Sequence, residues 1–307
     1  MAYVIKSVAS HKARSLLRMR FLTPLRYPGG KGKLADYVKD TYVANQILGG
    51  HYVEPYAGGG AVALDMLLSG TTEHIHMNDI DPAIYSFWHS VLYNTDALVD
   101  LIERTDVTIE EWERQREILK LNGGLSSEPS LELGFAAFFL NRTNRSGILK
   151  AGVIGGKAQA GQWTLDVRFN KADLVQRIKR ISLFSERISL YNLDAVELLR
   201  YLDGKIPEQS LIYLDPPYYV KGQGLYRNFY THEDHVKIKD ALAESVFSNW
   251  LVSYDNADEI RDIYSAYPQK IYSLQYTAQT KAVGSEVMIY SNGLTITDTA
   301  LGKTLAV

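Results

Sequence analysis

Four consecutive residues, Asp215-Pro216-Pro217-Tyr218, carry groups that suit one kind of chemistry. They follow an apolar run, and because two prolines cannot continue a strand, the chain must leave the predicted sheet there with a rigid backbone. The Asp215 carboxylate and the Pro216 carbonyl then become neighbouring acceptors, with the aromatic face of Tyr218 beside them. Two such acceptors could hold both N–H bonds of an aromatic amine and stabilise the positive charge that grows as it is alkylated. The pattern predicts methylation of a nucleobase amino group, with Tyr218 stacked on a flipped base.

A glycine-rich turn at 55–60 indicates a second site, for a nucleoside cofactor. It follows a predicted strand that ends at Glu54 and opens a helix, so Gly58 and its neighbours could let a ligand approach the backbone. Asp79 ends the next predicted strand, where a carboxylate can accept hydrogen bonds from both ribose hydroxyls. A tight turn would explain the glycines alone, and a surface turn would explain Pro-Pro alone. Together, these motifs favour a nucleoside-type cofactor.

Both motifs require a sheet that brings strand ends to one edge. Short β-branched or aromatic runs alternate with helix-length periodic segments, which predicts an α/β fold with a doubly wound, mostly parallel sheet. Little helix separates the last strands, so we predict that they form an antiparallel edge pair. The predicted strands are 51–54, 74–77, 188–191, 211–214, 250–254, 270–275 and 286–290, and the predicted helices between them include 61–68, 82–93, 195–201 and 232–243.

The alternation breaks between about residues 96 and 187, which predicts an inserted, mainly helical region. Residues 141–190 hold ten Lys and Arg against three acids, a local charge of +7 in a chain whose net charge is −2. Such asymmetry is typical of a phosphate-binding surface, although a solvated basic face would give the same count. We predict helices at 97–104, 109–121, 131–140 and 171–183. The predicted domains are a catalytic domain at 21–95 and 187–295, a target-recognition region at 96–186 and a basic N-terminal arm at 1–20.

Composition narrows the class of protein. The chain of 307 residues is 46% hydrophobic and 22% charged, which is typical of a soluble globular enzyme. No apolar run approaches the roughly 20 residues that span a bilayer. The absence of cysteine excludes disulfides and thiolate metal sites and fits a cytoplasmic location. His232 and His235 have no acidic partner at metal-ligand spacing, so we predict no metal.

The motifs and their order resemble the Dam-type adenine-specific (N6) DNA methyltransferase family, from roughly residue 21 to residue 292. The resemblance implies a Rossmann-like fold, S-adenosylmethionine as cofactor, and a DNA-recognition region between the two halves of the sheet. Four segments carry it: Leu-Arg-Tyr-Pro-Gly-Gly-Lys at 25–31, Glu-Pro-Tyr-Ala-Gly-Gly-Gly at 54–60, Asp-Ile-Asp at 79–81 and Asp-Pro-Pro-Tyr at 215–218.

The resemblance also implies roles for single residues. Tyr27 and Lys31 would contact S-adenosylmethionine, and an aromatic beside a sulfonium makes sense as a cation–π contact. Asp79 would hold the ribose and Asp194 the adenine, while Asp215 would lie beside both the methionine amino group and the target amine. The predicted cofactor-binding set is Tyr27, Lys31, Glu54, Gly58, Asp79, Asp194 and Asp215, and the predicted catalytic set is Asp215, Pro216, Pro217 and Tyr218.

The segment 138–150 resembles the part of the family that touches DNA. Asn and Arg read base edges through paired hydrogen bonds, whereas phosphate contacts position the protein without reading sequence. Some relatives carry an aromatic wedge near position 145 that this chain lacks, so their target sequence cannot be carried over. Trp163, Phe169 and Tyr226 could replace it, although core packing explains each equally well. The predicted DNA-binding residues are Arg142, Asn144, Arg145 and Lys150, with further phosphate contacts from Lys157, Lys171, Arg177, Lys179 and Arg180.

We therefore predict methyl transfer from S-adenosylmethionine to adenine N6 in a specific DNA sequence, by base flipping and in-line transfer. The expected partner is double-stranded DNA. A restriction endonuclease acting on the same site is one further partner that the class allows. The expected oligomeric state is a monomer. Three alternatives stay open: a cytosine-N4 methyltransferase, in which Ser more often replaces the Asp, an RNA adenine methyltransferase, and an inactive DNA-binding relative. A protein glutamine methyltransferase would carry Asn at position 215, and a dehydrogenase would leave Asp215–Tyr218 unexplained.

Overall fold

The computed structural model describes residues 22–26, 31–47, 49–122, 128–220, 230–276, 282–299 and 301. These residues form a seven-stranded sheet in the order β3-β2-β1-β4-β5-β7-β6. β7 is antiparallel to β5 and to β6, and the other pairs are parallel. The predicted fold class and the antiparallel final pair are therefore confirmed. The strands are β1 (Tyr52–Glu54), β2 (Ile75–Asn78), β3 (Ile188–Tyr191), β4 (Leu211–Leu214), β5 (Asn249–Asp255), β6 (Gln269–Tyr276) and β7 (Ala282–Tyr290).

The central strands are apolar because both faces of the sheet are covered. Every residue of β1, β2 and β4 is buried, as expected for parallel strands between two helical layers. Side chains alternate between two cores: Tyr52 and Tyr213 pack on one face, and Val53 and Ile212 on the other. Burial on both faces thus fixes the register and with it the position at which each strand ends.

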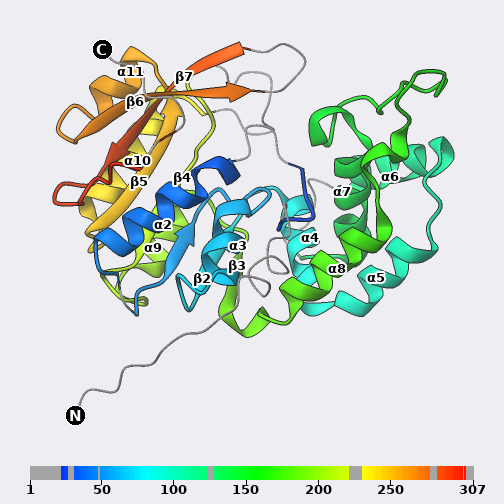
Figure 1. Cartoon of the computed structure of the whole chain (residues 1–307), viewed down its shortest axis with the longest axis horizontal. Coiled ribbons are helices and arrows are strands. Elements are labelled where there is room, and N and C mark those ends of the chain that lie inside the picture. The colour runs from blue at the N-terminus through cyan, green and yellow to red at the C-terminus, as the bar shows by residue number, and fades with distance from the viewer. Residues whose placement is uncertain are drawn as a thin grey trace, which may run out of the picture.

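Helices from different parts of the chain cover the two faces (Figure 1). One face packs against α2 (Ala35–Ala44), α3 (Ala61–Leu68) and α4 (Pro82–Tyr93). The opposite face packs against α9 (Ala195–Leu202), α10 (His232–Glu244) and α11 (Asp258–Ile263). The predicted bounds of α3, α4, α9 and α10 are close to those in the structure, whereas α2 and α11 were not predicted. No helix within the described residues is both long and apolar enough to span a membrane.

Within the described residues, four α-helices between α4 and β3 form the mainly helical region, seen in cyan to green beside the sheet in Figure 1. α7 is its core: it is buried on most sides, and its Gly134 touches α4 so closely that an added Cβ would lie 2.5 Å from Ser86 O. Side chains of α7 and of the sheet belong to one continuous apolar core. The four helices are α5 (Thr95–Arg104), α6 (Ile109–Asn122), α7 (Leu131–Thr143) and α8 (Lys171–Ser182).

His51, just before β1, clusters with His74 and His76 at the start of β2, beside side chains of β3. His51 Nδ1 lies 2.9 Å from His76 Nε2, and His76 Nδ1 lies 3.0 Å from the Tyr191 hydroxyl. His74 Nε2 lies 2.8 Å from Ser189 Oγ. Burial, together with the nearby His74 and His51, lowers the pKa of His76 to about 3. The folded protein therefore keeps His76 neutral at pH values where an unfolded chain protonates it.

We expect this cluster to make the fold sensitive to acid. The pKa of His76 is lower in the folded protein than in the unfolded chain, so neutral His76 contributes its full share to the free energy of unfolding above the usual pKa of ~6.5. This share falls as the pH drops from there towards the folded pKa, and about 1 kcal/mol is lost at pH 6. Urea unfolding at pH 7.5 and pH 6.0 measures the loss. His76→Gln keeps hydrogen-bonding groups but cannot titrate, so it should lose less stability than the wild type over this interval. Equal losses in the two proteins would contradict the assignment.

Candidate active site

The carboxyl ends of four neighbouring parallel strands bring acidic side chains to one edge of the sheet. Glu54 ends β1, Asp79 follows β2, and Asp215 follows β4. Asp194 follows β3 and begins α9. The described part of the chain therefore gathers acids that lie far apart in the sequence. Tyr27 and the side chain of Lys31 lie outside the described residues.

Glu54 is buried beneath the glycine turn. Only 5% of it is exposed, and Oε2 accepts a hydrogen bond of 2.9 Å from the Ala63 N–H in the first turn of α3. Burial raises the pKa of Glu54 to about 8; the Ala63 N–H opposes the rise, and the negative charge of Asp215 adds to it. The site therefore holds a carboxyl group that a nearby cation would drive to ionise.

Asp79 holds the glycine turn in place. Its Oδ2 accepts from Gly58 N–H at 3.0 Å and its Oδ1 from Asp81 N–H at 2.9 Å. Gly60 has a φ of +58°, and an added Cβ would lie 2.5 Å from Met77 Cε, so the turn needs glycine there. Burial raises the pKa of Asp79 to about 7, and the charge of Asp81 adds to the rise. A second carboxyl group is thus poised to ionise beside a cation.

Asn78 is a supporting residue that was not among the predicted site residues. It is 1% exposed, and its amide nitrogen donates to Pro55 O at 2.8 Å and to Leu193 O at 3.0 Å. Its Oδ1 accepts from Leu193 N–H at 2.9 Å. One amide therefore joins the loops after β1, β2 and β3. A polar residue at the end of an apolar strand was the signal that could have identified it.

Asp194 caps α9 by accepting from Val196 N–H at 2.9 Å. It lies near Tyr230, whose hydroxyl is 3.1 Å from that of Tyr56 in the glycine turn. Burial raises the pKa of Tyr230 to about 12, with Asp194 and Asp79 adding to the rise. Two tyrosines, neither of them predicted, therefore lie near the acids that follow β2 and β3. A direct role of Asp194 in ligand binding stays a prediction.

The Asp-Pro-Pro-Tyr loop leaves the sheet directly after β4. The Asp215 side chain is half-buried, and its Oδ1 accepts from Ser253 Oγ at 2.8 Å. Tyr218 is also half-buried, and its hydroxyl donates to Glu286 Oε1. Strands β5 and β7 therefore contact the two side chains that the sequence analysis placed at the centre of the chemistry.

The predicted DNA-binding residues separate into two groups. Arg145 and Lys150 are exposed in the turns that follow α7. Asn144 is fully buried: Oδ1 accepts from Trp112 Nε1 at 2.7 Å, and Nδ2 donates to Leu149 O at 2.8 Å and to Ile148 O at 3.0 Å. The prediction that Asn144 reads bases is corrected, because its amide is used inside the protein to shape the turn.

Arg142 is half-buried, and its guanidinium donates to the carbonyl of Arg168. Burial lowers its pKa, and the charge of Arg26 lowers it further. Among the predicted phosphate contacts, Lys157 pairs with Glu113 at 2.7 Å, and Arg177 pairs with Asp173. Lys171 donates to the carbonyl of Glu103 at 2.9 Å. Several side chains of the predicted basic surface therefore already have hydrogen-bond or ion-pair partners within the insert.

Asn141 links the insert to the segment before Tyr27. It is fully buried; its Oδ1 accepts from Arg26 N–H at 2.7 Å, and its Nδ2 donates to Arg26 O at 2.6 Å and to Gly147 O at 2.8 Å. At Gly147, where φ is +76°, an added Cβ would lie 2.4 Å from Arg26 O. The turn that carries Arg145 is thus fixed against residue 26.

The aromatic candidates in the insert also differ. Trp163 is 59% exposed, whereas Phe169 is 7% exposed and packs against Phe138 and Phe139 with ring centroids 5.4 and 5.3 Å apart. Tyr226 lies outside the described residues. Phe169 is therefore a core residue, and Trp163 has a large apolar surface available to a ligand.

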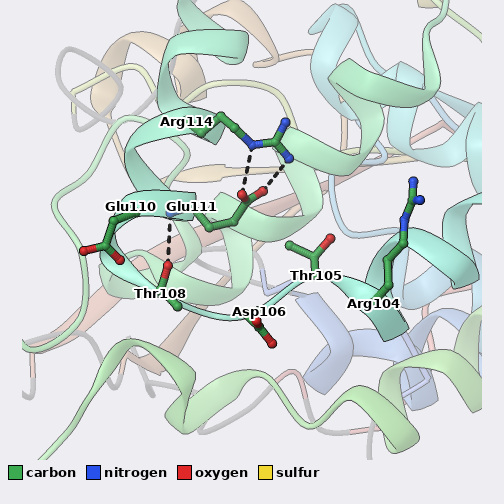
Figure 2. Close-up of a pocket in the computed structure, with 7 residues that line it drawn as sticks. All are labelled: Arg104, Thr105, Asp106, Thr108, Glu110, Glu111 and Arg114. Carbon is green, nitrogen blue, oxygen red and sulfur yellow. Dashed lines mark hydrogen bonds and ion pairs between the residues drawn. The ribbon is translucent and has the colours of Figure 1, made fainter.

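A shallow hollow of about 440 Å³ lies on the insert, between the end of α5 and the start of α6 (Figure 2). Its charges are largely paired: Glu111 accepts from Arg114 at 2.8 and 2.9 Å, and its own N–H donates to Thr108 Oγ1 at 3.2 Å. Its lining comes from the insert and does not include the strand-end acids. Within the described residues, no cluster of three or more His, Cys, Asp or Glu could hold a metal ion.

The strand order, the glycine turn after β1 and the acid after β2 define the Rossmann-like fold of the methyltransferases. Within that class, the family model of the D12 class N6 adenine-specific DNA methyltransferases matches residues 27–280. The chain therefore belongs to this family. A comparison with curated proteins finds no match.

Solved structures of methyltransferases align with this chain at low identity. AviRa, an rRNA methyltransferase of Streptomyces viridochromogenes, is 12% identical, with 94% of this chain and 96% of that one aligned and a TM-score of 0.41. A Pyrococcus horikoshii protein provisionally named an RNA methyltransferase is 9% identical, with 87% and 88% aligned and a TM-score of 0.41. A SAM-dependent methyltransferase of Agrobacterium tumefaciens is 8% identical, with 85% of this chain and 61% of that one aligned and a TM-score of 0.39.

Proposed function

We propose that this methyltransferase uses S-adenosylmethionine to methylate the N6 amino group of adenine in double-stranded DNA. The observation that carries the proposal is the Asp215–Tyr218 loop at the edge of the sheet, beside the buried Glu54. The Asp215 carboxylate and the Pro216 carbonyl would accept the two N–H bonds of the amine, and Tyr218 would stack on the flipped base. Placement of the amine, more than strong base catalysis, would then supply much of the rate.

The acids at the strand ends fit the proposed cofactor. Glu54, Asp79 and Asp215 gather at one edge, and burial raises the pKa of Glu54 and of Asp79. A cationic ligand would favour the ionised form of both carboxyl groups. Bound there, S-adenosylmethionine would supply a methyl group activated by its sulfonium. Asp79 would accept from the ribose and Asp215 from the amino group, with Tyr27 and Lys31 as further contacts.

The exposed groups of the insert support DNA as the partner. Arg145 and Lys150 could reach phosphates or base edges, and Trp163 has an aromatic face that could stack on a base. The turn that carries Arg145 is shaped by Asn144 and Asn141, so it would meet DNA with little reordering. Such preorganisation lowers the entropic cost of binding.

Transfer of labelled methyl from S-adenosylmethionine to plasmid DNA tests the proposal. The DNA is digested to nucleosides, and label in N6-methyladenine is the expected result. Label in N4-methylcytosine would overturn the choice of base. Label in RNA but not in duplex DNA, with both offered at equal concentration, would overturn the choice of nucleic acid. Omission of the protein is the blank, and S-adenosylhomocysteine should inhibit the transfer.

We expect Arg145→Ala and Lys150→Ala each to weaken duplex binding about fivefold, because each removes one cationic contact. Fluorescence anisotropy of a labelled duplex at several salt concentrations measures the effect, and the dependence of affinity on salt should become shallower by about one phosphate contact. Lys120→Ala, which removes an exposed cation that pairs with Glu117 on α6, is the matched control. Unchanged affinity and salt dependence in both test variants would contradict the DNA-facing role of this turn.

A further inference from the structure

Ser253 of β5 fixes the orientation of the Asp215 carboxylate. Its hydroxyl donates to Asp215 Oδ1 at 2.8 Å, and because that proton is committed, the Tyr213 hydroxyl 2.9 Å away must donate to Ser253. Tyr213 and Ser253 are both fully buried. Since β4 and β5 are paired up to Leu214 and Val252, the next residues on the two strands, Asp215 and Ser253, face each other. The carboxylate is therefore held from inside the sheet.

Asp255, two residues further along β5, holds the other end of the loop. Its Oδ1 accepts from Tyr219 N–H at 2.9 Å, and its Oδ2 accepts from Val220 N–H at 3.0 Å. Asp255 is 5% exposed. A buried carboxylate without hydrogen-bond partners is costly in free energy, so the two N–H groups stabilise the Asp255 carboxylate. The same two hydrogen bonds hold the loop backbone at Tyr219 and Val220 in place.

Glu286 of β7 holds the aromatic side chain of the motif. It is 1% exposed; Oε1 accepts from the Tyr218 hydroxyl, and Oε2 accepts from the Tyr272 hydroxyl at 2.6 Å. Glu286 is paired with Asp255 of β5 on one side and with Tyr272 of β6 on the other. The antiparallel β7 thus delivers a buried acceptor to the same edge of the sheet as Asp255.

We propose that Ser253, Asp255 and Glu286 are positioning residues for methyl transfer, acting through Asp215, the loop backbone and Tyr218. They contact different parts of the loop, and none of them needs to touch the substrate. Catalysis by placement requires reacting groups held to within about half an ångström, which buried partners on rigid strands can provide. This inference rests on the proposed function, because it assumes that Asp215 and Tyr218 engage the target base.

The test compares Ser253→Ala with Ser253→Thr. Alanine removes the hydrogen bond to Asp215, so kcat should fall about tenfold, while KM for DNA stays within about twofold of the wild type. Threonine keeps the hydroxyl and should restore most of kcat. Ser291→Ala is the matched control: Ser291 is buried near the opposite end of β5, and its hydroxyl accepts from Trp250 N–H at 3.2 Å. It should cost stability without lowering kcat.

The outcomes separate the inference from the proposed function. A wild type that methylates no nucleic acid would refute the proposed function itself. An active wild type with an equally active Ser253→Ala variant would overturn the inference, and so would a Ser253→Thr variant as slow as Ser253→Ala. Should Ser253→Ala fail to fold, the Glu286→Gln variant tests the inference in its place. It keeps the volume of the side chain but replaces one of the two acceptor oxygens by an NH2 donor, so the present pair of hydrogen bonds from Tyr218 and Tyr272 is lost, and wild-type kcat in that variant would overturn the inference.

Discussion

Replacing Asp215 by alanine is expected to lower the rate of methyl transfer by about a thousandfold while the protein stays folded. The side chain is half-buried in a loop beyond the end of β4, outside the two apolar cores, so its removal leaves no cavity in them. The lost carboxylate would leave one N–H of the target amine without its acceptor and the growing positive charge without its nearest counter-charge. Single-turnover transfer of labelled methyl to DNA measures the loss, and thermal unfolding checks the fold.

Two further variants sharpen this prediction. Asp215→Asn keeps an oxygen acceptor but removes the negative charge, so its rate should lie between those of the wild type and Asp215→Ala. Asp258→Ala removes an exposed acid that pairs with Arg261 at the start of α11 and should keep the wild-type rate. An Asp215→Ala variant that retains more than about a tenth of the wild-type rate would exclude a central role for this carboxylate.

Most of the fold could be predicted from local sequence because each strand is a short apolar run between turn residues. β3 and β4 begin and end at the predicted residues, and β5 and β6 extend at each end by one residue. Helices α2 and α11 were not predicted. α2 mixes apolar and charged residues without a clear apolar stripe and has no side-chain N-cap, and α11 is only six residues long, so neither has a strong periodic pattern. Their positions depend on packing against the sheet.

The site could be predicted only in part, because its residues belong to two kinds. Glu54 ends a strand, and Asp79 and Asp215 each directly follow one, so local sequence predicts their place and the parallel sheet brings them together. Glu286 lies in the middle of β7, and its place beside Tyr218 follows from pairing with strands 31 residues and 14 residues away in the chain. The residues around Glu286 in the sequence do not indicate which residues of β5 and β6 it pairs with.

Asn144 illustrates the opposite error. Its residue type suits base recognition, and its neighbours in the sequence are basic, so the pattern favoured an exposed side chain. In the fold, the next residue, Arg145, points to solvent, while Asn144 turns inward to Trp112 of α6. A turn presents alternate residues to different sides, and the sequence does not determine which residue of an Asn-Arg pair turns inward.

The affinity for S-adenosylmethionine is expected to rise about tenfold between pH 6.5 and pH 8. Glu54, with its pKa raised to about 8, is largely protonated at the lower pH, and Asp79, with its pKa raised to about 7, is partly so. A sulfonium favours the ionised carboxylates, so binding expels protons and is weakened when protons are abundant. Because the pKa of Glu54 is raised, the affinity for S-adenosylmethionine is lost as the pH falls below about 8. Isothermal titration calorimetry at several pH values measures it.

Two comparisons isolate Glu54 as the main cause. S-adenosylhomocysteine carries the same amino and carboxyl groups as S-adenosylmethionine but no sulfonium. Titration of the shared groups therefore affects both ligands equally and cancels when their pH profiles are compared. The affinity for S-adenosylhomocysteine should depend less steeply on pH. Glu54→Gln keeps an oxygen that can accept from Ala63 N–H but cannot ionise, so its affinity for S-adenosylmethionine should be lower at pH 8 and nearly independent of pH. Parallel pH profiles for the wild type and Glu54→Gln would assign the proton release elsewhere, with Asp79→Asn as the next variant to measure. A steep profile that Glu54→Gln flattens would identify the buried carboxyl at the end of β1 as the group that senses the charge of the cofactor.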